Sequence, residues 1–210
     1  MNLLDQLRSR RLLAIVRGRD ADASLRAVVT LAEEQVGLVE VSLTGCDASR
    51  VIARARAELG PDAALGAGTV LTAQDARRAA DAGASFLVTP GLGDGVLSEA
   101  DHLGLPVLAG ALTPTEIVAA TRAAVAVKLF PASLGGPPYL RALREPFSTV
   151  PFVPVGGVEA ASVRAYLAAG AIAVGVGSPL LGDAPHGGCL DALRERARTY
   201  RRLIEQETAS

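Results

Sequence analysis

The sequence of 210 residues has almost no lysine: of its 21 basic residues, only Lys128 is not an arginine. A protein that uses arginine so consistently would also use it wherever a solvated positive charge is enough. The single lysine is therefore expected to do chemistry that a guanidinium cannot do.

Aromatic residues are also scarce. They make up 3% of the chain and include no tryptophan, although half of the residues are hydrophobic. The core must then consist of closely packed alanine, valine, leucine and glycine, which suits helices lying on a parallel sheet. No apolar run approaches the length of a membrane span, and the segment Met1–Gln6 lacks the pattern of a signal peptide.

A strong net charge and cysteine clusters are absent as well. A net charge of -1 and an isoelectric point near 6.1 exclude a marked electrostatic footprint for nucleic acid or an anionic membrane. Cys46 and Cys189 have neither metal-ligand spacing nor the pattern of a disulfide framework, which indicates a reducing compartment. We expect a cytoplasmic protein with a small-molecule partner, no nucleic acid or membrane partner, and no bound metal.

From residue 12 onward, the sequence repeats a short apolar run with a polar or glycine tip, followed by a segment with helical spacing. The eight expected strands are Leu12–Arg17, Leu38–Leu43, Ala64–Thr69, Ser85–Pro90, Leu105–Ala109, Ala126–Phe130, Pro151–Gly156 and Ala171–Gly177. The expected helices include Ala21–Gln35, Thr72–Ala82, Ala160–Ala169 and a last one, Leu190–Gln206. Eight such units predict a single-domain (β/α)8 TIM barrel over residues 1–210, in the α/β class.

In barrels of this kind, functional groups lie at the carboxyl ends of the strands and in the loops that follow them. The expected strand ends bring together Arg17, Glu40, Thr69, Pro90, Lys128, Gly156, Gly157 and Ser178. Cations, one acid, hydroxyls and glycines are therefore predicted to share one end of the barrel.

Lys128 lies in the apolar run from Ala126 to Pro131, which reads as a buried strand. A lysine there loses hydration, and its ammonium form is disfavoured relative to the neutral amine. Neutral amine attacks carbonyl groups, so we interpret Lys128 as a Schiff-base nucleophile. The alternative is a core lysine that pairs with a carboxylate for structural reasons.

Glu40 alternates with Val39 and Val41 along its expected strand. With a period of two, the valines pack on helices and Glu40 faces the barrel interior, where it can approach Lys128 from the opposite side. This arrangement would place a proton carrier beside an amine nucleophile. The alternative is again a structural buried ion pair.

Glycines follow the seventh and eighth strands. Gly156, Gly157, Gly175, Gly177 and Ser178 lie where barrels of this class commonly bind phosphate through loop N–H groups, although tight packing at strand ends also favours glycine. Gly66 to Leu71 lacks the third glycine of a dinucleotide fingerprint, so nucleotide binding has little support.

Three further side chains remain. Arg17 has two possible roles, and each of the two histidines has one interpretation. Arg17 could hold a substrate carboxylate with help from Thr69, or could form an ion pair at the rim. His102 falls in a helical stretch and His186 in a loop rich in glycine and proline. We interpret both histidines as surface residues.

Seven segments resemble, in their order from about residue 12 to residue 180, the class I 2-keto-3-deoxy-6-phosphogluconate aldolase family, which includes the 6-phosphogalactonate aldolases. They are Leu13–Gly18, Val39–Leu43, Gly66–Val70, Val88–Gly91, Val127–Ala132, Val155–Val158 and Gly175–Ser178. The resemblance implies that Lys128 forms a Schiff base with a 2-keto acid and that Glu40 moves protons. The products would be pyruvate and glyceraldehyde 3-phosphate, and no cofactor would be needed.

The resemblance also implies substrate contacts. Arg17 and Thr69 would hold the keto-acid carboxylate, Gly156, Gly157 and Ser178 would hold the distal phosphate, and Pro90 would line the same site. Gluconate-type members usually carry arginine at the end of the Glu40 strand, where this chain has Thr44. The difference favours the galactonate branch and leaves the stereochemistry of the substrate open. The family commonly assembles as homotrimers, so a homotrimer is expected.

Two other functions fit the same features. A phosphosugar isomerase or epimerase would use the glycine loops and Glu40 without forming an imine. A non-catalytic phosphosugar-binding protein would use the loops alone, but a desolvated amine beside an acid is costly for binding only.

Overall fold

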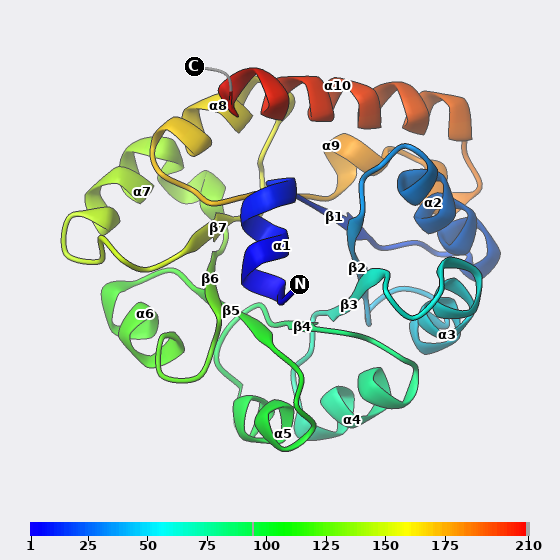
Figure 1. Ribbon diagram of the computed structural model, residues 1–210, viewed down its shortest axis with the longest axis horizontal. Coiled ribbons are helices and arrows are strands. Elements are labelled where there is room, and N and C mark those ends of the chain that lie inside the picture. Colours follow the sequence, from blue (N-terminus) through cyan, green and yellow to red (C-terminus); the bar gives the residue numbers. More distant parts are fainter. Residues whose placement is uncertain (94, 209–210) are drawn as a thin grey trace.

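Eight parallel strands form a ring that helices surround in this computed structural model, which describes residues 1–93 and 95–208 (Figure 1). The strand order is β7-β6-β5-β4-β3-β2-β1-β8. A parallel bridge between Val155 and Gly175, and a hydrogen bond of 3.0 Å from Ile172 N–H to Phe152 O, join the two ends of the sheet. The expected (β/α)8 barrel is thus confirmed, while Asp94 and residues 209–210 of the expected domain 1–210 lie outside the described residues.

The strands are β1 (Leu12–Val16), β2 (Leu38–Ser42), β3 (Ala64–Gly68), β4 (Leu87–Val88), β5 (Val107–Ala111), β6 (Ala126–Leu129), β7 (Phe152–Pro154) and β8 (Val174–Val176). The α-helices are α1 (Leu3–Arg10), α2 (Ala21–Glu33), α3 (Ala48–Leu59), α4 (Ala73–Asp81), α5 (Val96–His102), α6 (Pro114–Ala120), α7 (Gly136–Arg144), α8 (Ala160–Ala168), α9 (Ser178–Leu181) and α10 (Leu190–Thr208). Two 3-10 turns, η1 (Ala132–Leu134) and η2 (Ala184–His186), follow β6 and α9.

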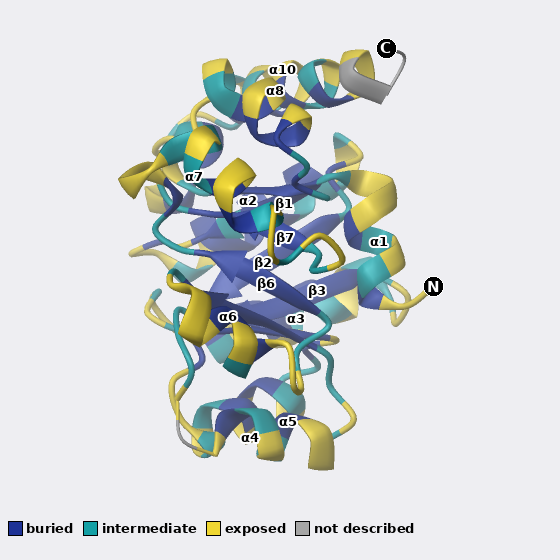
Figure 2. Cartoon of the chain, turned by 90° about the vertical axis from the view of Figure 1, so that its left-hand side faces the viewer, coloured by how far each residue is buried: buried dark blue, intermediate teal, exposed yellow. Residues whose placement is uncertain are grey.

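Alternation along each strand divides the apolar residues between two cores. Val39 and Val41 belong to the layer between strands and helices, whereas Leu38 of the same strand belongs to the barrel interior. Glu40 lies between the two valines and therefore faces the interior, as its period of two predicts. Figure 2 shows the strands buried between more exposed helices.

Most strand positions agree with the sequence, and β5 is the clearest correction. It begins at Val107 and not at Leu105. Gly104 has a φ of 68°, and the N–H of Leu105 bonds to Ala100 O at 2.9 Å, so the chain is still completing the end of α5. Only Leu87–Val88 of the expected strand Ser85–Pro90 is regular.

Helix α1 is an element that the sequence analysis did not predict. The side chain of Asn2 accepts the N–H of Asp5 at 2.9 Å, which is an N-terminal cap. Leu3 and Leu7 are buried and pack with the apolar side chains of the barrel interior. In Figure 1, α1 lies across the ring of strands. The helix thus covers the amino end of the barrel and leaves the carboxyl end for a site.

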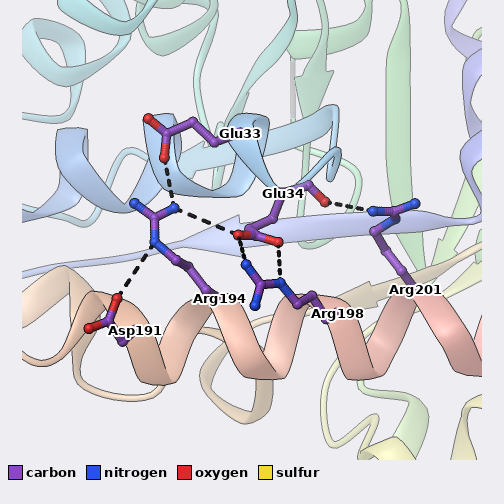
Figure 3. Close-up of polar contacts among 6 residues, drawn as sticks. All are labelled: Glu33, Glu34, Asp191, Arg194, Arg198 and Arg201. Atoms are coloured by element: carbon purple, nitrogen blue, oxygen red, sulfur yellow. Dashed lines mark hydrogen bonds and ion pairs between the residues drawn. The ribbon is translucent and has the colours of Figure 1, made fainter.

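Helix α10 packs on α2 through both apolar and ionic contacts. Its own residues Leu193, Ala197 and Tyr200 are buried and form its apolar side. On its polar side, Arg198 donates two hydrogen bonds of 2.7 Å to the carboxylate of Glu34, and Arg194 donates one of 2.7 Å to Glu33 (Figure 3). Helix α10, which was expected to be a solvated outer helix, therefore also contributes to the core. It covers the seam where β1 meets β8.

Leu7→Ala should lower the free energy of unfolding by about 2–5 kcal/mol, because it opens a cavity at a fully buried site. The matched control is Val118→Ala on α6, where 47% of the residue is exposed and the change should stay within about 0.5 kcal/mol. Urea unfolding at equilibrium measures both. Equal effects of the two substitutions would contradict the role of α1 as the cover of the barrel interior.

Candidate active site

A cavity of about 350 Å³ opens at the carboxyl end of the barrel. All eight residues singled out from the sequence line it: Arg17, Glu40, Thr69, Pro90, Lys128, Gly156, Gly157 and Ser178. Other lining residues include Ser42, Phe130, Val155, Pro185 and His186. In the described part of the chain, no three His, Cys, Asp or Glu side chains gather closely enough to hold a metal ion, and no helix could span a membrane.

Lys128 reaches the cavity from β6, where it pairs with Gly110 of β5 and Val153 of β7. Only 5% of the residue is exposed. Its Nζ lies 5.1 Å from the centroid of the Phe130 ring, which is within the range of a cation–π contact. The aromatic face thus supports a positive charge on this nitrogen without a carboxylate partner.

Glu40 reaches the same cavity from β2, and a glycine makes room for it. Position 68 on β3 has no side chain, and a Cβ atom there would overlap the Glu40 carboxylate. Among the described residues, Oε2 of Glu40 is fully buried and has no hydrogen-bond partner. Burial raises the pKa of Glu40, and the charge of Lys128 offsets only part of this rise.

The two side chains share the cavity but form no direct ion pair among the described residues. The sequence predicts that Glu40 approaches Lys128. In the structure both side chains line one cavity, but they do not form an ion pair. A structural salt bridge would show short N–O distances and satisfied oxygens. The observed geometry instead leaves an amine and a carboxyl group on the wall of one cavity without an ion pair between them.

A row of hydroxyl groups extends from the rim into the cavity. Ser42 Oγ lies 2.8 Å from Thr44 Oγ1 and 2.9 Å from Thr69 Oγ1. Thr69 has a φ of 57°, which a β-branched residue adopts at a cost. The hydrogen bond to Ser42 fixes the hydroxyl of Thr69. Thr44 is also hydrogen-bonded to Ser42, but it does not line the cavity.

Gly156 and Gly157 form a tight turn after β7, with φ values of 90° and 76°. Both values favour glycine, and a Cβ atom at position 157 would lie 2.6 Å from Ser133. Within the described residues, the N–H groups of these two glycines donate no hydrogen bond. Two consecutive unpaired donors at a cavity wall suit an anion.

Arg17 and Pro90 complete the rim on two other sides. Arg17 is exposed and, in the described ranges, forms no ion pair, so the rim salt bridge considered above is not observed. Pro90 comes so close to β5 that a Cβ atom at Gly110 would overlap its backbone. Gly110 is therefore required for the placement of the β4 loop over the cavity.

His186 is exposed, as the sequence predicts, and it also lines the cavity, which the sequence did not predict. It lies in η2, and its Nδ1 accepts the N–H of Arg19 at 3.1 Å. The two residues are 167 positions apart. No local pattern signals such a contact, which only closure of the barrel between β8 and β1 creates.

The fold and the cavity together define a (β/α)8 barrel enzyme with its site at the carboxyl ends of the strands. Residues 3–186 match the family described as KDPG and KHG aldolase, and the chain belongs to this family.

Among curated relatives, a KHG/KDPG aldolase of Escherichia coli K12 is 38% identical over 78% of this chain and 78% of its own length. A probable 2-dehydro-3-deoxy-6-phosphogalactonate aldolase of Rhizobium meliloti is 35% identical over 81% of this chain and 82% of its own. A solved native KDPGal structure superposes with a TM-score of 0.88 at 29% identity, covering 95% of this chain and 96% of that one.

Glu40→Gln should stabilise the protein, and more so as the pH rises. Because the pKa of Glu40 is raised on folding, the cost of the buried carboxylate is absent below its ordinary value of 4.5 and complete above the raised pKa. We expect a higher melting temperature for the variant near about pH 8 and no difference near about pH 4.

Glu34→Gln is the matched control with the opposite sign. Hydrogen bonds from Arg198 lower the pKa of Glu34, so its contribution to stability is present above the ordinary value of 4.5 and is lost as the pH falls through the lowered pKa. This variant should be less stable than the parent at neutral pH. If both variants lost stability at neutral pH, Glu40 would be a structural ion-pair partner of Lys128.

Proposed function

We propose that this protein is a class I aldolase that cleaves a phosphorylated 2-keto-3-deoxy sugar acid to pyruvate and glyceraldehyde 3-phosphate. The observation that carries the proposal is the presence of Lys128 and the unpaired Glu40 in one desolvated cavity. Family membership supports the same reaction class, because the relatives named above are aldolases for gluconate-type and galactonate-type substrates.

The proposed reaction starts at Lys128. Its neutral Nζ attacks C2 of the substrate, and the carbinolamine loses water with a proton from Glu40, which gives an iminium ion and leaves Glu40 as a carboxylate. Glu40 then takes the proton of the 4-hydroxyl, the C3–C4 bond breaks, and its electron pair moves into the iminium to give an enamine. Glyceraldehyde 3-phosphate leaves, the enamine is protonated at C3, and water releases pyruvate and regenerates the amine.

The raised pKa of Glu40 suits this exchange, since a carboxyl group that is protonated more readily than usual can both accept and return a proton. In this proposal, Arg17 and Thr69 hold the substrate carboxylate. The free N–H groups of Gly156 and Gly157, together with Ser178, hold the phosphate, and Pro90 limits the cavity on the β4 side.

Incubation with pyruvate and borohydride should add one reduced pyruvyl group to the protein, on Lys128. Intact mass followed by peptide mapping locates it, and because the chain has no other lysine, the α-amino terminus is the one competing amine. Lys128→Met is the control that should take up no group at an internal position. Absence of an adduct on the parent protein would favour an isomerase or epimerase, or a binding protein, on the same barrel.

Glu40→Gln should keep the fold and lower turnover by a factor of about 10² to 10⁴, which is the usual loss for a general acid–base group. The amide has the same shape as the carboxyl group and cannot exchange the proton. A coupled pyruvate-release assay measures the loss. Parent-like turnover would exclude Glu40 from proton transfer.

Removing the phosphate from the substrate should lower kcat/KM at least about tenfold, or about 1.4 kcal/mol in transition-state binding. We further propose that the galacto-configured substrate is accepted at least as well as the gluco epimer, since Thr44 leaves no long cation at the rim. Pyruvate release from both epimers measures this preference. Equal rates with and without the phosphate would contradict the proposed phosphate site. A strong preference for the gluco epimer would contradict the assignment to the galactonate branch.

We also propose a cytoplasmic homotrimer, on the basis of the family resemblance. Light scattering after size-exclusion chromatography should give about three times the 21.5 kDa of one chain.

A further inference from the structure

We propose that His186 is an additional binding residue for the distal phosphate of the substrate, a role that rests on the function proposed above. His186 lines the cavity together with Ser178, Pro179 and Gly182 of the same segment after β8. Gly156, Gly157 and Ser178 offer this phosphate loop donors, and the imidazole of His186 would add a ring N–H donor from the segment after β8.

The inventory of ionisable side chains in the cavity supports the assignment. The ionisable residues that line it are Arg17, Glu40, Lys128 and His186. Lys128 and Glu40 are used in the chemistry, and Arg17 is used for the carboxylate at the other end of the substrate. His186 is the ionisable side chain that the proposed reaction leaves without a role.

The ring is held in place by the loop that follows β1. Gly18 packs so closely on η2 that a Cβ atom there would overlap the backbone of Pro185. The buried hydroxyl of Ser24 donates to Pro185 O at 3.4 Å, and the N–H of Arg19 donates to His186 Nδ1 at 3.1 Å. The side chain is therefore positioned before the substrate arrives, which reduces the entropy cost of binding.

The contact with Arg19 also decides which ring nitrogen can bind a ligand. Because Nδ1 accepts a hydrogen bond, the proton of the neutral ring lies on Nε2. Among the described residues, this Nε2 has no hydrogen-bond partner. It is thus a free donor on a residue that lines the cavity, and a phosphate oxygen is the acceptor that the proposed substrate brings there.

Two substitutions separate the two nitrogens. His186→Asn keeps an acceptor near the position of Nδ1, for the N–H of Arg19, but removes the donor at Nε2. His186→Gln keeps a donor near the position of Nε2 but loses the contact with Arg19. Each variant is assayed for aldol addition of pyruvate to glyceraldehyde 3-phosphate and to unphosphorylated glyceraldehyde.

His186→Asn should lower kcat/KM for glyceraldehyde 3-phosphate by about 10- to 100-fold, the usual scale of a lost hydrogen bond to a charged group, and leave glyceraldehyde unchanged. His186→Gln should retain more of the preference for the phosphorylated aldehyde. Equal losses on both aldehydes, or a larger loss of preference in the glutamine variant, would overturn the proposal in favour of a structural role.

Borohydride trapping of pyruvate on the same variants separates this inference from the proposed function. Both histidine variants should form the Lys128 adduct as the parent does, because His186 does not take part in imine formation. An adduct with unchanged aldehyde preference overturns the role of His186 alone, whereas no adduct on the parent protein overturns the aldolase itself.

Discussion

The desolvation of two opposite charges that do not pair is the constraint on which this structure depends. Lys128 and Glu40 are both almost completely buried, and the described residues provide no ion pair between them. In water, hydration would hold Glu40 as the carboxylate, whereas burial in the barrel raises its pKa. The barrel provides the dry cavity, and Phe130 provides the lysine with an aromatic face in place of a counter-ion.

The absence of side chains at particular positions makes this arrangement possible. Gly68 leaves the space that the Glu40 carboxyl group occupies, and Gly110 allows Pro90 to approach β5. Any larger residue at position 68 would push Glu40 away from its place on the cavity wall.

Stability and reactivity are kept at opposite ends of the barrel. Helix α1 closes the amino end with Leu3 and Leu7, and α10 covers the seam between β1 and β8. The carboxyl end holds the buried carboxylate, whose raised pKa is a cost to folding. The apolar contacts at the closed end offset that cost, so the open end can keep an unsatisfied acid.

The sequence predicts the barrel well because eight repeats of a short apolar run and a helical segment allow few other folds. It predicts the inward direction of Glu40 for the same reason, since Val39 and Val41 fix the alternation. Helix α1 was missed because it follows no strand, and β5 was misplaced because Leu105 completes a helix end. His186 could not be found from local pattern, since its position depends on a contact with Arg19 that only the closed barrel forms. Whether Lys128 and Glu40 would touch also depended on side-chain geometry across the barrel, which periodicity does not contain.

A nuclear magnetic resonance experiment with lysine labelled at Cε tests the central claim most directly, since the single lysine gives a single signal. Addition of pyruvate should replace that signal by a new one at the position of a methylene carbon bonded to an iminium nitrogen, and removal of pyruvate should restore the original. A signal that stays unchanged at saturating pyruvate would contradict the account, because Lys128 would then not be the group that reacts with the keto acid.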